Sequence, residues 1–293
     1  MELLDGRMLA QQIRNELAEA VKDLTKDGAR PPHLAAILVG DNPASQAYVR
    51  NKVRSCEKVG FASTLVKKEA DISEADLLEV VNQLNRDPEI DGFIVQLPLP
   101  DHIDEHKVTL AIEPAKDVDG FHPINFGRMA QGLPCYVPAT PYGIVEMLKR
   151  YKIETSGKEV VVIGRSNIVG TPMSILLSRK DNPGNATVTL CHSRTKDLKS
   201  HTLKADIIVA AIGRPNFVTE DMVKEGAIII DVGINRIDDA SAKRGYRLVG
   251  DVDFDKVAPK SAYITPVPGG VGQLTVASLL LNTLKARRKE VYK

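Results

Sequence analysis

Residues 160–172 read Val-Val-Val-Ile-Gly-Arg-Ser-Asn-Ile-Val-Gly-Thr-Pro, and their order indicates the architecture of the second half of the chain. The β-branched run 160–163 predicts a buried strand, Gly164 a tight turn, and the residues after it the start of a helix. A helix amino terminus presents unpaired backbone N–H groups to a pyrophosphate, at the carboxyl edge of the sheet. The spacing departs from G-x-G-x-x-G, so the order of elements favours a dinucleotide site more than the glycines do.

The same alternation of strands and helices continues outward in both directions. Helices are predicted over 9–28, 44–59, from Ser73, 142–151 and 275–287, and strands over 34–39, 92–97, 160–163, 187–190, 207–212 and 227–232. Because the strands are apolar on both faces, they predict parallel sheets flanked by helices. We expect two α/β domains around a cleft, the second a Rossmann-like domain with a parallel sheet. The first would hold residues 1–141 and 275–293, and the second 142–274.

Composition limits the classes of partner. The 39 Lys and Arg balance the 38 Asp and Glu of this 293-residue chain, giving a net charge of +1, so no nucleic-acid or membrane binding is expected. The three cysteines are dispersed, which argues against a disulfide framework, and no cluster with metal-ligand spacing is found. No apolar run approaches the roughly 18 residues of a membrane span. A cytoplasmic protein with a small-molecule partner is predicted.

The residues after the predicted strand 187–190 favour NADP over NAD. Many NAD sites place an acidic residue there for the ribose 2′-hydroxyl, but this chain reads Cys191-His192-Ser193-Arg194, with Arg165 expected nearby. If Arg165 and Arg194 each gain roughly 1.5 kcal/mol from a 2′-phosphate, NADP is preferred about a hundredfold. The alternative is that both are solvated surface arginines beside an ordinary strand-to-helix turn.

Two further clusters are candidates for chemistry in the first half. Tyr48 and Lys52 are four apart on a predicted helix and share a face, although a lysine that merely covers apolar surface has the same spacing. Gln96 lies at the carboxyl end of a buried strand, where open α/β sheets bind ligands. Asp117 and Asp119 precede Gly120, a pattern equally typical of a turn or a helix cap.

The segment 265–272, Thr-Pro-Val-Pro-Gly-Gly-Val-Gly, carries no charge and lies between a strand-like run and a helix. Glycine allows a backbone to approach a ligand closely, and proline fixes its own φ. The segment therefore predicts a ligand contact, the alternative being a tight connection between a strand and a helix.

Together these segments resemble the bifunctional methylenetetrahydrofolate dehydrogenase/cyclohydrolase family over nearly the whole chain. The shared blocks are Gly40-Asp41 with Ser45, Tyr48 and Lys52, the run Val95–Pro98, Asp117–Gly120, Gly164–Pro172, Asp231–Asn235, Val249–Val252 and Thr265–Gly272. Two positions depart from the family pattern: Ala139 stands where cysteine is frequent, and Gln273-Leu274 replaces a common Pro-Met pair.

The resemblance implies the site residues. Lys52 would be the catalytic acid/base, Tyr48 and Gln96 would position it and the folate, and Asp119 would hold the pterin ring. The implied substrate-binding set is Tyr48, Lys52, Val95, Gln96, Leu97, Asp119, Pro268, Gly269, Gly270, Val271 and Gly272. The implied cofactor-binding set is Gly164, Arg165, Ser166, Ser193, Arg194 and Ile234.

The resemblance also implies the activity. The enzyme would oxidise 5,10-methylenetetrahydrofolate with NADP and hydrolyse the methenyl product to 10-formyltetrahydrofolate, as a metal-independent homodimer of the one-carbon metabolism that supplies purine and amino-acid biosynthesis. A fused formate-ligase domain is not expected at this length. The alternatives are an NADP-dependent dehydrogenase of another small substrate and a non-catalytic nucleotide sensor.

Overall fold

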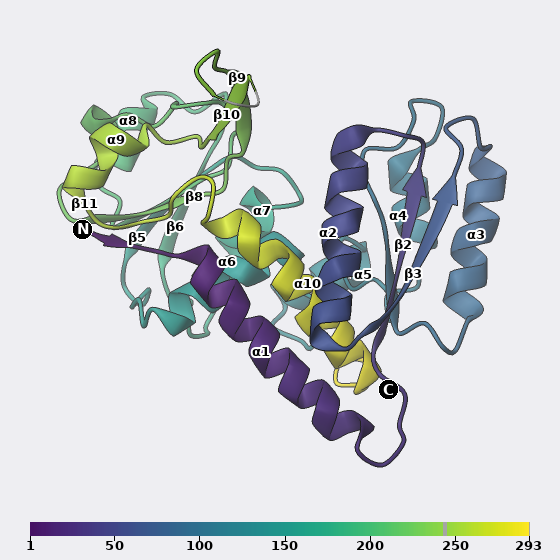
Figure 1. Cartoon of the computed structure of the whole chain (residues 1–293). Helices are drawn as coiled ribbons and strands as arrows, with labels where there is room; N and C mark the ends of the chain where they lie inside the picture. Colours follow the sequence, from purple (N-terminus) through teal and green to yellow (C-terminus); the bar gives the residue numbers. More distant parts are fainter. Residues whose placement is uncertain (243–244, 293) are drawn as a thin grey trace. The chain divides into compact units, whose positions relative to one another are not determined.

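A computed structural model describes residues 1–242 and 245–292 (Figure 1). They form two compact units: unit 1 contains Met1–Ala10 and Thr140–Thr275, and unit 2 contains Gln11–Ala139 and residues 276–292. The expected two-domain α/β architecture with a parallel central sheet is confirmed. The observed division differs from the expected one at the amino terminus, where residues 1–10 group with unit 1. The reason is that β1 (Glu2–Leu3) pairs with β11 (Ser261–Ile264).

Unit 2 is built on a three-stranded parallel sheet in the order β3-β2-β4, formed by β3 (Ala62–Lys68), β2 (His33–Val39) and β4 (Gly92–Val95). Six of the seven residues of β2 are buried, as expected of a central strand covered on both faces. Figure 1 shows α2 (Pro43–Val59) and α3 (Glu74–Arg86) on opposite faces of this sheet.

The helices of unit 2 begin and end where their capping residues predict. Asn42 accepts hydrogen bonds from the first N–H groups of α2, and Gly60 ends it in the left-handed conformation. Ser73 caps α3 by accepting from Asp76 N at 3.1 Å. The remaining helices are α1 (Gly6–Thr25), α4 (Glu105–Ala111), α5 (Pro123–Ala130) and α10 (Val271–Arg287), of which α1 and α10 cross the boundary between the units.

Unit 1 holds a six-stranded parallel sheet in the order β1-β11-β8-β7-β5-β6. Its other strands are β5 (Glu159–Ile163), β6 (Thr187–Cys191), β7 (Ile207–Ala210) and β8 (Ala227–Asp231). The helices of this unit are α6 (Ala139–Arg150), α7 (Gly170–Ser178), α8 (Leu198–Thr202) and α9 (Phe254–Val257), and β9 (Asn235–Asp238) and β10 (Tyr246–Val249) form a separate antiparallel pair.

Several predicted boundaries are wrong by a few residues, and two of them matter for the site. The strand predicted over 92–97 ends at Val95, because Pro98 has no N–H with which to extend the ladder. Gln96 and Leu97 therefore lie in the segment that follows β4. The last helix begins at Val271 rather than Thr275, so Val271 and Gly272 form its first turn. Glycine is tolerated there since the first N–H groups of a helix have no intrahelical partner.

Candidate active site

Lys52 and Gln96 meet at the carboxyl edge of the sheet of unit 2. Lys52 Nζ donates to Gln96 Oε1 at 3.1 Å, and the Gln96 amide donates to the carbonyl of Leu97 at 2.8 Å. The second bond fixes which end of the amide faces the amine. Burial lowers the pKa of Lys52 from its ordinary value, and the negative charge of Asp119 opposes this shift. The lysine is thus a partly buried amine with a neutral acceptor beside it.

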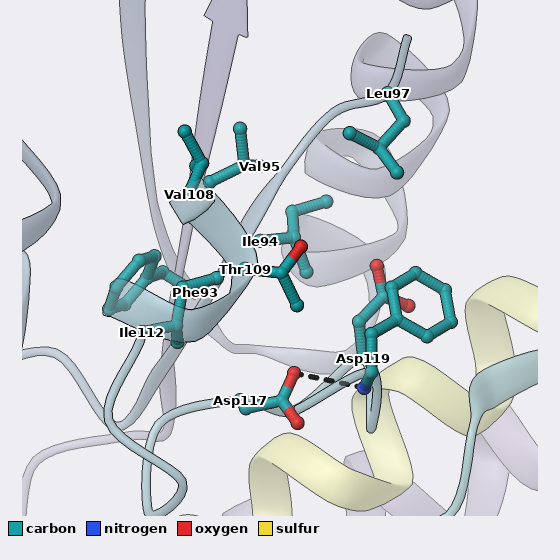
Figure 2. Close-up of a pocket in the computed structure, with 10 residues that line it drawn as sticks. Phe93, Ile94, Val95, Leu97, Val108, Thr109, Ile112, Asp117 and Asp119 are labelled. Atoms are coloured by element: carbon teal, nitrogen blue, oxygen red, sulfur yellow. Dashed lines mark hydrogen bonds between the residues drawn. The ribbon is translucent and has the colours of Figure 1, made fainter. Parts of the chain in front are cut away.

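Asp119 lies on a turn that Asp117 holds in place. The Asp117 carboxylate accepts from Phe121 N at 3.2 Å, the bond that is dashed in Figure 2. It also accepts from His122 N at 2.8 Å and from the Asn125 amide at 2.9 Å. Burial raises the pKa of Asp119 from its ordinary value, and the Lys52 charge opposes this. The sequence left open whether Asp117 stabilises a turn or a helix end, and in the structure its carboxylate holds the turn together. Asp117 was not among the predicted site residues.

A small cavity adjoins this turn and is lined mainly by β4, α4 and the two aspartates (Figure 2). Val95 and Leu97 border it, and Asp119 lies at its edge. Its volume of about 20 Å³ leaves room for roughly one water molecule. The cavity is therefore too small to hold a ring system.

Tyr48 lies one helical turn before Lys52 on α2. Its side chain is 51% exposed, so its ring is open to a ligand rather than packed in the core. The predicted residues Lys52 and Gln96 are brought together by a hydrogen bond, and Tyr48 shares the α2 face of the lysine through the helical spacing.

The turn between β5 and α7 fits a dinucleotide. Gly164 has φ of 116°, and a Cβ there would lie 2.1 Å from the carbonyl oxygen of Ala211. A Cβ on Gly170 would lie 1.9 Å from the carbonyl oxygen of Gly164, so the turn closes only with both glycines. The start of α7 has no side-chain cap, which leaves the positive end of the helix for an anion.

The cationic residues lie at the same edge of the sheet. Ile163 and Cys191 are in register on the adjacent strands β5 and β6, so Arg165 and Ser193, each two residues further on, follow neighbouring strand ends. Arg165, Ser166, Ser193 and Arg194 are all exposed. The backbone of Arg194 is held by a hydrogen bond to His192 Nδ1 at 3.2 Å. This arrangement suits a phosphate on the adenosine ribose.

The segment Pro268–Gly272 packs on backbone within unit 1. Arg7 N donates to the carbonyl of Gly269 at 3.2 Å, and a Cβ on Gly6 would lie 2.0 Å from the carbonyl oxygen of Gly270. A Cβ on Gly272 would lie 2.9 Å from Ile234 Cδ1, which places two predicted site residues side by side. Ile234 itself is 48% exposed.

The two positions that depart from the family pattern are ordinary in their surroundings. Ala139 is buried as the first residue of α6, and Gln273 is exposed in the first turn of α10.

Within residues 1–242 and 245–292 no helix is long and apolar enough to cross a membrane. Over the same ranges, no three His, Cys, Asp or Glu side chains are grouped to hold a metal ion.

Comparison with known proteins gives matches over both units. Residues 4–119 match the family described as tetrahydrofolate dehydrogenase/cyclohydrolase, catalytic domain, and residues 138–291 match its NAD(P)-binding domain. The bifunctional protein FolD of Cytophaga hutchinsonii is 63% identical over 286 residues, which cover 98% of this chain and 99% of that protein. The bifunctional protein FolD of Bacteroides thetaiotaomicron is 59% identical over the full length of both.

Solved structures also match over nearly the whole chain. The bifunctional enzyme FolD of Campylobacter jejuni superposes with a TM-score of 0.93 at 48% identity, covering 99% of each chain. The Trypanosoma brucei methylenetetrahydrofolate dehydrogenase-cyclohydrolase, solved with NADP cofactor and an inhibitor, has a TM-score of 0.92 at 40% identity and covers 99% of this chain and 98% of its own.

Proposed function

Because the chain belongs to the tetrahydrofolate dehydrogenase/cyclohydrolase family, we propose that Lys52 transfers the protons of the cyclohydrolase reaction, with Gln96 as its neutral partner. The protein is a bifunctional enzyme of folate one-carbon metabolism. It oxidises 5,10-methylenetetrahydrofolate to 5,10-methenyltetrahydrofolate with NADP, and it hydrolyses this product to 10-formyltetrahydrofolate.

The observation that carries the role of Lys52 is its uncharged hydrogen-bond partner. Gln96 Oε1 accepts from the amine at 3.1 Å without adding a negative charge that would stabilise the ammonium. Burial lowers the pKa of the amine. An amine with a lowered pKa gives and takes protons closer to neutral pH than a solvated lysine does.

In the proposed hydrolysis, Lys52 begins as a neutral amine. Water attacks the methenyl carbon, and the amine takes the proton that the attacking oxygen loses. The ammonium then returns this proton to the pterin nitrogen as the bond between that nitrogen and the carbon breaks. The hydroxyl proton leaves to solvent as the formyl C=O forms, so one proton is released overall.

In the oxidation, NADP supplies the acceptor for the hydride from the methylene carbon. We assign the pyrophosphate to the turn at Gly164–Ser166 and the start of α7, and the 2′-phosphate to Arg165, Ser193 and Arg194. Tyr48, Asp119 and the segment 95–97 would orient the folate, so that the protein contributes alignment. Contact of Ile234 with the cofactor, and of Pro268–Gly272 with folate, stay predictions.

Three wider properties belong to the same proposal. We assign the folate-binding chemistry to unit 2 and dinucleotide binding to unit 1. The protein would work as a symmetric homodimer, the commonest assembly of soluble proteins, and sedimentation velocity measures this. It would act in the cytoplasm and supply one-carbon units to purine and amino-acid biosynthesis, which a deletion strain that needs those nutrients would support.

Substituting Lys52→Met tests the proposal, since methionine keeps the length of the side chain and removes the amine. Hydrolysis of supplied methenyltetrahydrofolate should fall by at least about 10²-fold, the usual contribution of a positioned acid/base. The dissociation constant for NADP should stay within about twofold. Lys58→Met, an exposed lysine on the same helix, is the matched control and should retain both. Hydrolysis that persists in Lys52→Met would remove the assigned role.

A further inference from the structure

Loops from distant parts of unit 1 converge at the carboxyl edge of its sheet. In register, Ala210 at the end of β7 lies between Ile163 on β5 and Asp231 on β8. The segment 211–214 after β7 therefore borders the glycine turn after β5. The close approach of Ala211 to Gly164 shows this directly, because no Cβ fits between them. A change in the path of this segment would displace the turn that we assign to the pyrophosphate.

One buried carboxylate holds the segment. Asp251, with no exposed surface, accepts from three consecutive backbone N–H groups, at 2.6 Å from Ile212, 2.9 Å from Gly213 and 2.9 Å from Arg214. A fourth donor, the Asn235 side-chain amide, reaches the same carboxylate at 2.9 Å. Asn235 is the neighbour of Ile234 in the chain. The Asp251 carboxylate thus joins the loop after β7 to the segment after β8.

A second buried carboxylate fixes the backbone position of Asp251. Asp231, 3% exposed, accepts from the backbone N–H groups of Gly233, Asp251 and Val252, each at 2.9 Å. The two carboxylates interlock through glycines. A Cβ on Gly233 would lie 2.2 Å from Asp251 Oδ1, and a Cβ on Gly250 would lie 1.8 Å from Asp231 Oδ2. In the segments Asp-Val-Gly at 231–233 and Gly-Asp at 250–251, the glycine of each makes room for the aspartate of the other.

We propose that Asp251, seated by Asp231, is a positioning residue for the dinucleotide, and that it serves hydride transfer but not hydrolysis. The inference rests on the proposed function of the two units. Its basis is that every group donating to the Asp251 carboxylate lies after β7 or β8, beside the glycine turn or Ile234, and belongs to unit 1. Lys52, Gln96 and Asp119 belong to unit 2 and share no bond with it.

Asp251→Asn tests this with little change in shape. An amide offers one accepting oxygen, so its NH2 group must face N–H groups that now point at the carboxylate. Hydrogen bonds to a charged group are among the stronger ones, so losing them should displace the segment 212–214. We therefore expect the dissociation constant for NADP to rise roughly tenfold to hundredfold. Isothermal titration calorimetry would give the dissociation constant, and KM for NADP should rise in parallel. The rate of hydrolysis of supplied methenyltetrahydrofolate without NADP should stay within about twofold.

Two further variants keep the test decisive. Asp255→Asn, an exposed aspartate four residues along the chain, is the matched control and should change neither activity. Asn235→Ala removes a single donor to Asp251 and serves if Asp251→Asn does not fold. It should raise the NADP dissociation constant by a smaller factor and leave hydrolysis unchanged.

The outcomes separate cleanly. Unchanged NADP affinity in Asp251→Asn or in Asn235→Ala would overturn the proposal. An equal loss of oxidation and hydrolysis would also overturn it, because that is the signature of a purely structural residue. The calorimetric titration needs no turnover. If the natural protein bound NADP but failed to oxidise methylenetetrahydrofolate, the proposed function would fail while the test of Asp251 stood.

Discussion

At the scale of single residues, the role that we propose for Lys52 depends on how two neighbours affect the pKa of its amine. The Lys52 amine has a neutral acceptor in Gln96 and a charged group, Asp119, close enough to influence it. Burial favours the neutral amine and Asp119 favours the ammonium. The amine acts as a base only when neutral, so the acid limb of the pH profile for hydrolysis should follow its pKa.

Exchanging these neighbours should move that limb in opposite directions. Asp119→Asn removes the charge that raises the pKa of Lys52, so the limb should shift to lower pH. Gln96→Glu places a carboxylate beside the amine, stabilises the ammonium and should shift the limb to higher pH. The measurement is kcat for hydrolysis against pH at saturating substrate. If both variants moved the limb the same way, Lys52 would not be the group that titrates.

At the scale of elements, two helical glycines differ in whether the surrounding structure leaves room for a Cβ. Gly170 lies at the start of α7 against the Gly164 carbonyl, whereas Gly127 lies inside α5 with no atom within 4 Å of a Cβ. Gly170→Ala should force the backbone apart, cost about 1–3 kcal/mol of unfolding free energy and weaken NADP binding. Gly127→Ala should instead stabilise the protein by about 0.5–1 kcal/mol, because alanine loses less conformational freedom in a helix. Chemical denaturation measures both changes. An unchanged unfolding free energy in Gly170→Ala would show that the turn can accommodate a Cβ.

At the scale of the whole molecule, cofactor binding should appear as stability. A ligand at a hundred times its dissociation constant adds about 2.7 kcal/mol to the unfolding free energy of the unit that binds it. If NAD binds about a hundredfold more weakly, for lack of contacts to Arg165 and Arg194, the same concentration adds only about 0.4 kcal/mol. Differential scanning calorimetry with each nucleotide gives the comparison. Equal shifts in the midpoint would remove the assignment of these arginines to the 2′-phosphate.

Much of the secondary structure can be predicted from short segments of the sequence. The apolar runs of β2, β5, β7 and β8, the cap at Ser73 and the glycine turn at Gly164 each act within one short window of residues. A window of that size carries the helical or strand period and the turn chemistry. The strand β3, which lies at the edge of its sheet and is mostly half-buried or exposed, was not predicted. The two-residue strand β1 and the hairpin of β9 and β10 also escaped prediction, because the first is too short to show a period and the second carries charged residues such as Arg236 and Arg247.

What the amino-acid sequence determined by itself was the type and order of many of the elements, the family, and the candidates Lys52, Gln96 and Asp119. Only the tertiary structure showed that Asp251 gathers the N–H groups of residues 212–214 with Asn235, and that Asp117 caps the turn beneath Asp119. The physical reason is that propensity and periodicity act between neighbours, whereas these bonds form only after parallel strands bring their carboxyl ends to one edge. Ile212 and Asp251 are 39 positions apart in the sequence, so no local pattern predicts that they meet.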